Sequence, residues 1–396
     1  MRILWSLPVR GEYLGSGRGD LVRAQSLIEA LTQAGHEVKT VEFGSPPAVS
    51  AYRNIFSRMM PGFAAKIVRD AGRWLASMGH GHRVALGAVE FGADAIVETQ
   101  VGFSFSGAIA AESSGLPLIL DDCSPSREEE ILGAGLPCLA RRALRRQARA
   151  ASVLAVTSHD LMESLVREGL PPEKIRIMPN GIDLQAYAVL NRETLRSRMG
   201  FADRCVIGFA GSFQPWHGTD LLMAALAGLS RDLSWSLLLV GEGPHLKPAL
   251  QRLNLFGLGR RVTVTGSVPP GQVPALIACF DIGVLPGSND YGHPMKLLEY
   301  AAAGAAIIAP DLPPVRRMVQ HFKTGLLFPR GDVEGLTGAL SLLVCRKTLR
   351  RRLADAALCS IGHKDSWSAR GHDLAAVIES LVVKNPCAAF PGDLRQ

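Results

Sequence analysis

The sequence predicts an α/β protein built from two doubly wound parallel sheets. Short apolar runs alternate with helical patterns along the chain, and this alternation breaks off near the middle and then starts again. Alternating strands and helices are typical of parallel sheets that carry helices on both faces. The chain has 396 residues, more than one hydrophobic core usually supports. We therefore expect two domains, each with its own sheet.

Strands of the first half are predicted from apolar runs bounded by turn residues. They are residues 3–7, 37–43, 95–97, 118–120, 153–156 and 175–178. The first helix is expected at 20–34, where apolar residues recur at helical spacing, and a helical insert interrupts the pattern at 50–85. This rhythm predicts the first sheet.

The second half repeats the pattern after a Pro-Asn-Gly turn and a polar stretch at 191–204. Its expected strands are residues 206–210, 236–240, 262–265, 282–285 and 306–309, and its last helices are 332–344, 347–359 and 365–383. The predicted organisation is an N-terminal domain (1–184), a C-terminal domain (185–364), a final helix (365–384) and a loose tail (385–396).

Composition narrows the class of protein. With 47% hydrophobic, 20% charged and 6% aromatic residues, the chain is neither disordered nor fibrous. A net charge of +7 favours anionic partners such as phosphorylated small molecules or acidic lipid head groups. Nucleic acid is the weakest of these partners, because the chain has no helix-turn-helix or zinc-finger spacing and no interleaving of aromatic and basic residues.

Cysteine usage and the lack of long apolar segments bear on location. The seven cysteines are scattered, with no CxxC pair, which argues against a disulfide framework or a structural zinc. The N-terminal apolar stretch is too short for a signal peptide, and no window of eighteen apolar residues predicts a membrane span. We therefore expect a cytoplasmic protein.

Residues 282–310 carry the most chemical information. An apolar strand, the loop PGSNDYGH, a helix opening at Pro294 and a second apolar strand form a predicted parallel βαβ unit, and ligands of such sheets bind beyond the carboxyl ends of the strands. Proline suits the first helical position, and the free N–H groups of that turn form an anion site. Lys296 and Glu299 share one helix face, either as a surface pair or as ligands for a phosphate and a sugar hydroxyl.

The string from Tyr291 to Gly304, YGxPxKLxEYxAxG, resembles a variant of the donor-binding motif of retaining glycosyltransferases with two Rossmann-like domains, the GT-B fold of family 4 or group 1. Further matches are GHEV (35–38), EKIRIMPNGID (173–183), GFAGSFQPWHG (208–218), LLLVGEGP (237–244) and VTVTGSV (262–268). The resemblance implies two Rossmann-like domains facing a cleft, with the donor in the second domain and the acceptor in the first. It also implies metal-independent chemistry without a cofactor, the co-substrate being a UDP- or GDP-type nucleotide sugar.

The chain departs from the family pattern at three positions. Tyr291 stands where most members have a first glutamate, and Ser212 and His217 replace an Arg and a Lys. Positive charge is then expected from Lys296 and the helix start, with His217 either protonated or a neutral hydrogen-bonding residue. The implied donor-binding residues are Gly17, Gly19, Gly211, Ser212, His217, Val268, Tyr291, Gly292, His293, Lys296, Leu297 and Glu299. Of these, Lys296 is also a catalytic candidate, Glu299 is expected to bind the ribose, and Val268 to lie near the base.

The loop GSGRG at 15–19 in the first domain invites a comparison with dinucleotide sites. Its spacing is GxGxG rather than GxGxxG, which argues against a nicotinamide enzyme. Gly17 and Gly19 are expected to let the backbone approach the diphosphate and acceptor. Asp121 and Asp122 stand where many relatives have a histidine, and each is either an acceptor-activating base or a helix cap. Asp122 is the catalytic candidate.

One expected helix carries a run of arginines: Arg141, Arg142, Arg145, Arg146 and Arg149. This run forms either a solvated face or a contact with anionic lipid, which would make the protein peripheral at the inner membrane face. The predicted function is retaining transfer of a hexose-type sugar to a hydroxyl of a glycan, lipid-linked or small-molecule acceptor. The alternatives are an inactive nucleotide-sugar-binding homologue and a sugar-nucleotide epimerase of the same fold.

Overall fold

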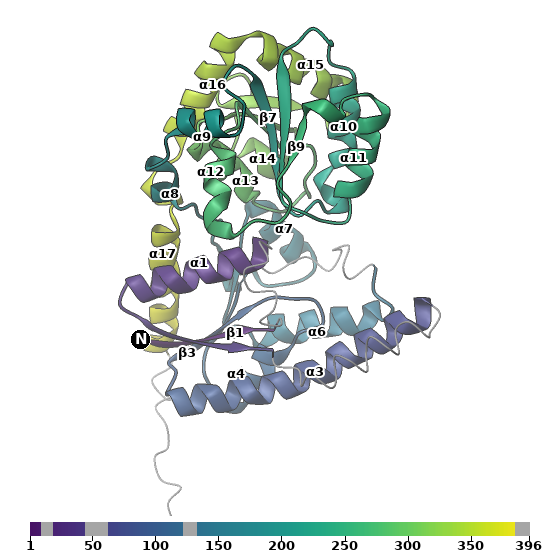
Figure 1. Cartoon of the computed structure of the whole chain (residues 1–396). Coiled ribbons are helices and arrows are strands. Elements are labelled where there is room, and N and C mark those ends of the chain that lie inside the picture. Colours follow the sequence, from purple (N-terminus) through teal and green to yellow (C-terminus); the bar gives the residue numbers. More distant parts are fainter. Residues whose placement is uncertain (9–18, 44–61, 122–132, 385–396) are drawn as a thin grey trace, which may run out of the picture. The chain divides into compact units, whose positions relative to one another are not determined.

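The computed structural model describes residues 1–8, 19–43, 62–121 and 133–384. The chain divides into two compact units (Figure 1). Unit 1 is formed mainly by residues up to Pro179 together with the chain from Arg370 onward, and unit 2 mainly by Asn180–Ala369. Each unit holds a six-stranded sheet.

The sheet of unit 1 is parallel, with the strand order β2-β1-β3-β4-β5-β6. Its strands are β1 (Arg2–Leu7), β2 (Glu37–Glu42), β3 (Ala95–Thr99), β4 (Leu118–Asp121), β5 (Val153–Val156) and β6 (Ile175–Ile177). The helices of this unit are α1 (Gly19–Gln33), α3 (Gly62–Phe91), α4 (Ser106–Ser114), α6 (Pro137–Ala150) and α7 (His159–Arg167), with the short η2 (Pro172–Lys174) before β6. The strand order reverses beside β1, as in a doubly wound sheet.

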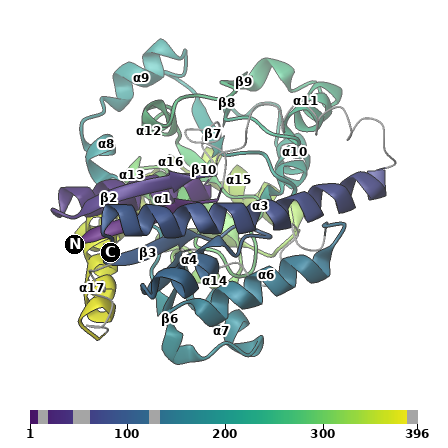
Figure 2. The same cartoon turned by 90° about the horizontal axis from the view of Figure 1, so that it is seen from below.

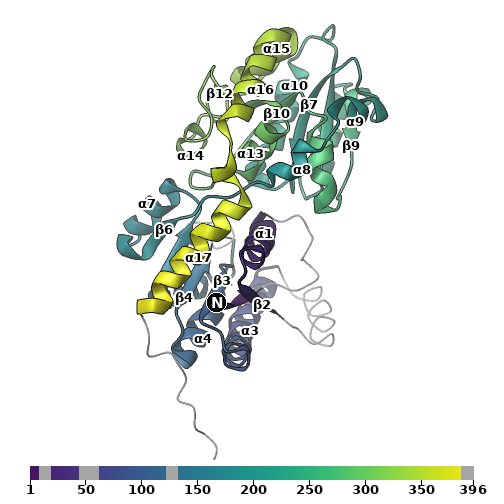
Figure 3. The same ribbon diagram turned by 90° about the vertical axis from the view of Figure 1, so that its left-hand side faces the viewer.

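Helices cover both faces of this sheet. The helices α3, α4 and α6 lie side by side on one face, which Figure 2 shows from below. On the other side, α1 lies beside α17 (Trp367–Lys384) (Figure 3). A Cβ atom on Gly371 would lie 2.6 Å from Cβ of Ala30, so glycine allows these two helices to approach closely.

The second sheet, in unit 2, is also parallel, with the order β12-β11-β10-β7-β8-β9. Its strands are β7 (Cys205–Ala210), β8 (Trp235–Val240), β9 (Val262–Val264), β10 (Ile282–Val284), β11 (Ala306–Pro310) and β12 (Gly325–Phe328). Its helices are α8 (Leu184–Ala188), α9 (Arg192–Arg198), α10 (Thr219–Ala227), α11 (Leu246–Leu255), α12 (Val273–Ile277), α13 (Met295–Ala302), α14 (Pro313–Arg316), α15 (Val333–Cys345) and α16 (Lys347–Ser360). The short helices are η3 (Pro215–His217), η4 (Gly259–Arg261), η5 (Pro270–Gln272) and η6 (His363–Asp365).

The core of unit 2 lies on both faces of its sheet. Alternate residues of a strand point to opposite faces, so Ile207 and Phe209 of β7 pack with α10, α11 and α15. Val206 and Ala210 pack instead with α12, α13 and α14. Burial on both faces explains why these strands are continuous apolar runs in the sequence.

The predicted fold class is confirmed, and every strand expected from the sequence is present with bounds shifted by at most two residues. β12 was not among the expected strands. The helical insert corresponds, in the described residues, to the long helix α3. Within the described residues, no helix is both long enough and apolar enough to cross a membrane.

Candidate functional site

The candidate site lies in unit 2, where the loops after β7, β8 and β10 meet at the carboxyl ends of their strands. Close backbone packing holds these loops together. A Cβ atom on Gly243 would lie 1.8 Å from the carbonyl oxygen of Ser212, and one on Gly218 would lie 3.0 Å from the nitrogen of Gly287. Glycine is therefore required at these two positions to bring the three loops into one cluster.

Helix α13 begins at this cluster. The prediction that Pro294 occupies the first helical position is wrong by one residue: Pro294 is the N-cap, because its ψ of 108° is extended rather than helical. Its carbonyl accepts the N–H of Leu297 at 3.1 Å. The hydroxyl of Tyr300 accepts the N–H of Ala210 at 3.2 Å and donates to the carbonyl of Val284 at 3.3 Å. Tyr300, which the sequence analysis did not single out, thus fixes the helix to β7 and β10.

The side chain of Lys296 reaches from α13 to the loop after β7. Its Nζ lies 3.3 Å from Nε2 of His217 and 5.7 Å from the centre of the Phe209 ring. Gly211 leaves room for this path, because a Cβ atom there would lie 2.7 Å from Cε of Lys296. Helix α13 and the segment after β7 therefore place one amine beside one imidazole.

His217 is neutral in this position. Burial, together with the neighbouring Lys296, lowers the pKa of His217 to about 2. Its Nδ1 accepts the backbone N–H of Gln214 at 3.2 Å, so the single proton of the neutral ring belongs on Nε2. Of the two alternatives left open by the sequence, the structure favours the neutral residue. Its Nε2–H bond is directed at Lys296.

The pair thus consists of two N–H groups that face each other. Burial lowers the pKa of Lys296, and the charge of Glu299 opposes that shift. Burial raises the pKa of Glu299, and Lys296 opposes it. When Lys296 loses a proton, its Nζ can accept the Nε2–H of His217. An anionic oxygen at this place would accept hydrogen bonds from both groups, which are strongest when one partner is charged.

Other predicted residues lie in the loop after β10, in α13 and after β9. The N–H of Gly292 donates to the side-chain oxygen of Asn289 at 2.6 Å, and the amide of Asn180 donates to the carbonyl of His293 at 2.7 Å. Tyr291 is half-buried in this loop. Leu297 is different, because its side chain is only 2% exposed and belongs to the core. Val268 follows β9 and packs partly buried against the same core.

Two of the predicted site residues, Gly17 and Asp122, lie outside the described residues. Gly19 begins α1. Asp121 ends β4 and forms a buried ion pair with Arg23: Nη2 and Oδ1 are 2.8 Å apart, and both side chains are 1% exposed. The carboxylate of Asp121, which the sequence left open as a base or a helix cap, accepts hydrogen bonds from the Arg23 guanidinium group in the described residues. No local pattern in the sequence indicates this pair, because Arg23 and Asp121 are 98 positions apart.

Among the described residues, no group of three or more His, Cys, Asp or Glu side chains comes together as metal ligands would. Metal independence itself stays an expectation.

Two family models match the chain. The model of Glycosyltransferase Family 4 matches residues 21–186, and the model of Glycosyl transferases group 1 matches residues 204–346. The chain belongs to this glycosyltransferase family. The glycosyltransferase motifs found in the sequence all lie within these two regions, and the predicted family is confirmed.

The curated relatives of this chain are distant. The GDP-mannose-dependent alpha-(1-6)-phosphatidylinositol monomannoside mannosyltransferase of Mycolicibacterium smegmatis is 26% identical over 61% of the chain and 65% of the relative. The alpha-D-kanosaminyltransferase of Streptomyces kanamyceticus is 28% identical over 61% of the chain and 62% of the relative. The chain thus spans less than two thirds of these relatives' lengths.

Solved structures resemble the chain over nearly its whole length. Anabaena HepE in complex with UDP-glucose has a TM-score of 0.75 at 18% identity, covering 96% of this chain and 100% of that one. Sucrose-phosphate synthase from Thermosynechococcus elongatus has a TM-score of 0.75 at 17% identity, covering 97% and 100%. At these identities the likeness concerns the fold.

Proposed function

We propose that the protein is a retaining, metal-independent glycosyltransferase that moves a hexose-type sugar from a UDP- or GDP-type nucleotide sugar to a hydroxyl group. The acceptor is a glycan, a lipid-linked molecule or a small molecule, as in polysaccharide or glycoconjugate biosynthesis. The observation that supports this most directly is the pair of N–H groups of Lys296 and His217 beside Glu299, at the carboxyl ends of parallel strands. Family membership and the UDP-glucose held by Anabaena HepE agree with it.

The chemistry follows from where charge develops. When the bond from the anomeric carbon to the diphosphate breaks, negative charge grows on the leaving phosphate oxygen, and fixed donors aimed there lower the barrier. Lys296 and the Nε2–H of His217 supply these donors, and the first turn of α13 adds its N–H groups. Glu299 accepts hydrogen bonds from the ribose, and Val268 lies by the base. The leaving diphosphate helps to deprotonate the acceptor on the same face, which retains the anomeric configuration.

The first domain would complete the reaction. Gly17 and Gly19 bring backbone near the diphosphate and acceptor, and Asp122 is the candidate base. Asp121 has no such part, because Arg23 occupies its carboxylate.

Transfer by the purified protein tests the proposal. Sugar transfer and donor hydrolysis are measured for wild type, Lys296→Ala and Glu299→Ala, with the exposed Lys323→Ala as the matched control. We expect both site variants to lose at least about tenfold in turnover, and the control to stay near wild type. Unchanged turnover in both site variants refutes the site.

An inactive nucleotide-sugar-binding homologue is the second candidate, since a neutral His217 and Ser212 stand at the places of two cations. Tight binding of nucleoside diphosphate without turnover across donor and acceptor panels would favour it. An epimerase would instead change the donor in the absence of any acceptor, which nuclear magnetic resonance of the donor incubated alone detects.

We also propose that the protein works in the cytoplasm, peripheral at the inner membrane face. Support comes from the arginines of α6 and from α3, which exposes Val68, Leu75 and Met78 by 51%, 67% and 43%. Basic and apolar groups together bind anionic membrane surfaces. The M. smegmatis relative, named for a phosphatidylinositol acceptor, agrees with a lipid-linked substrate. Co-sedimentation with phosphatidylglycerol vesicles tests this, and no binding at low salt refutes it.

A further inference from the structure

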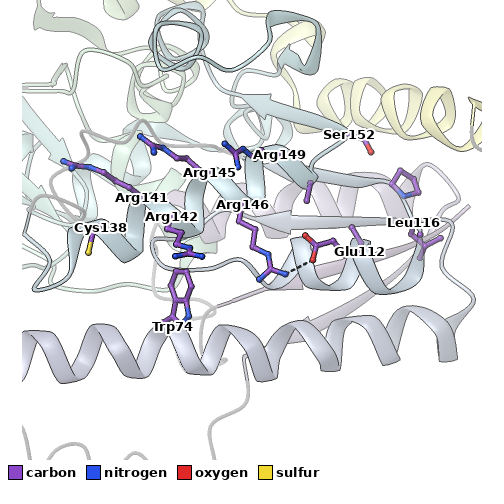
Figure 4. A pocket seen from close by; sticks show the side chains of 14 residues that line it. Trp74, Glu112, Leu116, Cys138, Arg141, Arg142, Arg145, Arg146, Arg149 and Ser152 are labelled. Atoms are coloured by element: carbon purple, nitrogen blue, oxygen red, sulfur yellow. Dashed lines mark hydrogen bonds and ion pairs between the residues drawn. The ribbon is translucent and has the colours of Figure 1, made fainter.

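A hollow of about 1240 Å³ opens in unit 1 beside α6. We call it the arginine hollow, because its lining includes Arg141, Arg142, Arg145, Arg146 and Arg149, with Trp74 of α3 at its side (Figure 4). Other lining residues, Leu116, Pro117 and Ser152, directly precede β4 and β5. The hollow therefore extends to the amino ends of these strands, whereas ligands of the reaction are expected at the carboxyl ends.

The positive charge of the arginine hollow is largely uncompensated. Helix α6 contains no acidic residue, and Arg146 pairs with Glu112 of α4 at 2.6 Å. In the described part of the chain, Arg142 and Arg145 form no ion pair or side-chain hydrogen bond. Like charges four residues apart on a helix repel each other and destabilise it. Repulsion among these arginines therefore destabilises α6, and a bound anion would reduce that repulsion.

The backbone under the arginines is held firmly. Gln147 accepts the N–H of Ala108 at 2.6 Å through its side-chain oxygen and donates to the buried Glu98 through its Nε2. Ala143 and Ala148 are buried on the same inner face of α6. The arginines therefore project from a fixed helix, which lowers the entropy lost when a ligand binds.

Side-chain directions define two rows. Arg142 and Arg146 point toward α3 and α4, and Arg142 lies over Trp74; Arg141, Arg145 and Arg149 form the other row along the helix (Figure 4). Neighbours three or four residues apart on a helix have Cβ atoms about 5–6 Å apart. A group that carries two or more negative charges can thus contact the guanidinium groups of neighbouring arginines in one row. Guanidinium matches phosphate in a bidentate manner.

We propose that the arginine hollow binds a group with two or more adjacent phosphates, in addition to the nucleotide sugar. The concave shape favours a discrete head group over a flat membrane, and Leu116, Pro117 and Trp74 offer apolar surface beside the charges. If the phosphates belong to a lipid head group, the proposal depends on the membrane contact proposed above. A soluble oligophosphate would use the same contacts.

Binding of inorganic tripolyphosphate to the full chain tests the phosphate chemistry by calorimetry. The variant is Arg142→Gln/Arg145→Gln, and the matched control is Arg351→Gln/Arg352→Gln on the exposed face of α16 in unit 2. We expect the hollow variant to bind at least about tenfold more weakly and the control to bind as wild type does, because hydrogen bonds between guanidinium and phosphate groups are among the strong ones. Equal weakening in both variants, or none in the hollow variant, overturns the proposal.

The same titration in Lys296→Ala separates this site from the proposed donor site. Tripolyphosphate binding that survives in Lys296→Ala and is lost in the hollow variant supports the arginine hollow whatever the fate of the transfer activity. Binding lost only in Lys296→Ala assigns the phosphate to unit 2 and overturns the proposal.

Vesicles distinguish the two sources. Phosphatidylcholine vesicles carrying a diphosphate lipid are compared with phosphatidylglycerol vesicles of equal total charge. Stronger recruitment by the diphosphate lipid, lost in Arg142→Gln/Arg145→Gln, assigns a lipid head group. Tripolyphosphate binding without such a preference assigns a soluble ligand. If the protein binds both kinds of vesicle equally and does not bind tripolyphosphate, the discrete site is overturned and the arginines form a diffuse basic surface.

Discussion

Nζ of Lys296 lies 3.3 Å from Nε2 of His217, and the other ring nitrogen of this histidine already accepts the N–H of Gln214. Two groups that both carry protons therefore face each other when no ligand is bound. Loss of a proton from Lys296 relieves the conflict, and so does an anion placed between them. Protonation of Lys296 and binding of a diphosphate are consequently coupled in the site that we propose.

Nucleoside diphosphate binding is expected to take up protons. Burial lowers the pKa of Lys296 in the free protein, and a bound diphosphate raises it again because an opposite charge favours the protonated amine. Between these two pKa values, binding adds a proton, so affinity falls as the pH rises through this window. Calorimetry in buffers of different ionisation enthalpy measures the uptake. Lys296→Met should abolish it, and pH-independent affinity in wild type would contradict the coupling.

The position of the cation is expected to be exchangeable between the two residues. Lys296→Ala should lower kcat about a hundredfold, the usual cost of removing one donor to a developing oxyanion. His217→Lys alone should also lower activity, because it brings two amines together. The double variant Lys296→Ala/His217→Lys should recover at least about tenfold over Lys296→Ala, measured as kcat with saturating donor. If the loss of kcat in the double variant equals the product of the losses in the two single variants, a cation at position 217 does not replace the one at position 296.

Removal of Asp121 should destabilise unit 1 strongly. Its carboxylate and the Arg23 guanidinium are both almost fully buried, and breaking one side of such a pair costs about 3–5 kcal/mol. Urea unfolding of Asp121→Ala measures this loss. Arg23→Met/Asp121→Leu, which leaves no buried charge, should lose less than the single variant. Glu37→Ala, which removes the exposed pair with Arg2, should stay within about 1 kcal/mol of wild type. A similar small effect of Asp121→Ala would contradict the buried pair.

Local patterns in the sequence were enough to predict the fold. Apolar runs bounded by glycine, proline and polar residues identified the strands, because burial on both faces of a parallel sheet leaves continuous apolar segments. β12 was not predicted, since its four residues follow a loop without a helical pattern to frame them. The start of α13 was displaced by one residue because the dihedral angles of Pro294 decide between N-cap and first turn.

Contacts distant in sequence could not be predicted. Lys296 and His217 are 79 positions apart, and Arg23 and Asp121 are 98 apart. The neutral state of His217 depends on burial and on one backbone N–H, neither of which the sequence reveals. The arginines of α6 were recognised, but the hollow needs walls from α3 and α4, which only tertiary packing brings together.

Glu98 should make unit 1 less stable as the pH rises. Its carboxylate is fully buried and accepts hydrogen bonds from Ser6 at 2.8 Å and from Ser106 at 2.7 Å. Burial nevertheless raises its pKa. The folded state therefore holds the proton more tightly than the unfolded state, and stability is greatest below the unfolded pKa and falls as pH rises through the folded pKa.

Glu98→Gln removes this titration while keeping the shape of the side chain. Its free energy of unfolding should gain on wild type by up to about 1.4 kcal/mol per pH unit across that window. Urea unfolding of both proteins over a pH series measures the difference. Burial lowers the pKa of His80 to about 4, so this residue has the opposite effect: it makes the folded protein less stable as the pH falls. It is present in both proteins, so its effect cancels to first order. Glu112→Gln, at an exposed site, is the control, and parallel pH curves for Glu98→Gln and wild type would show that this carboxyl group has an ordinary pKa in the folded protein.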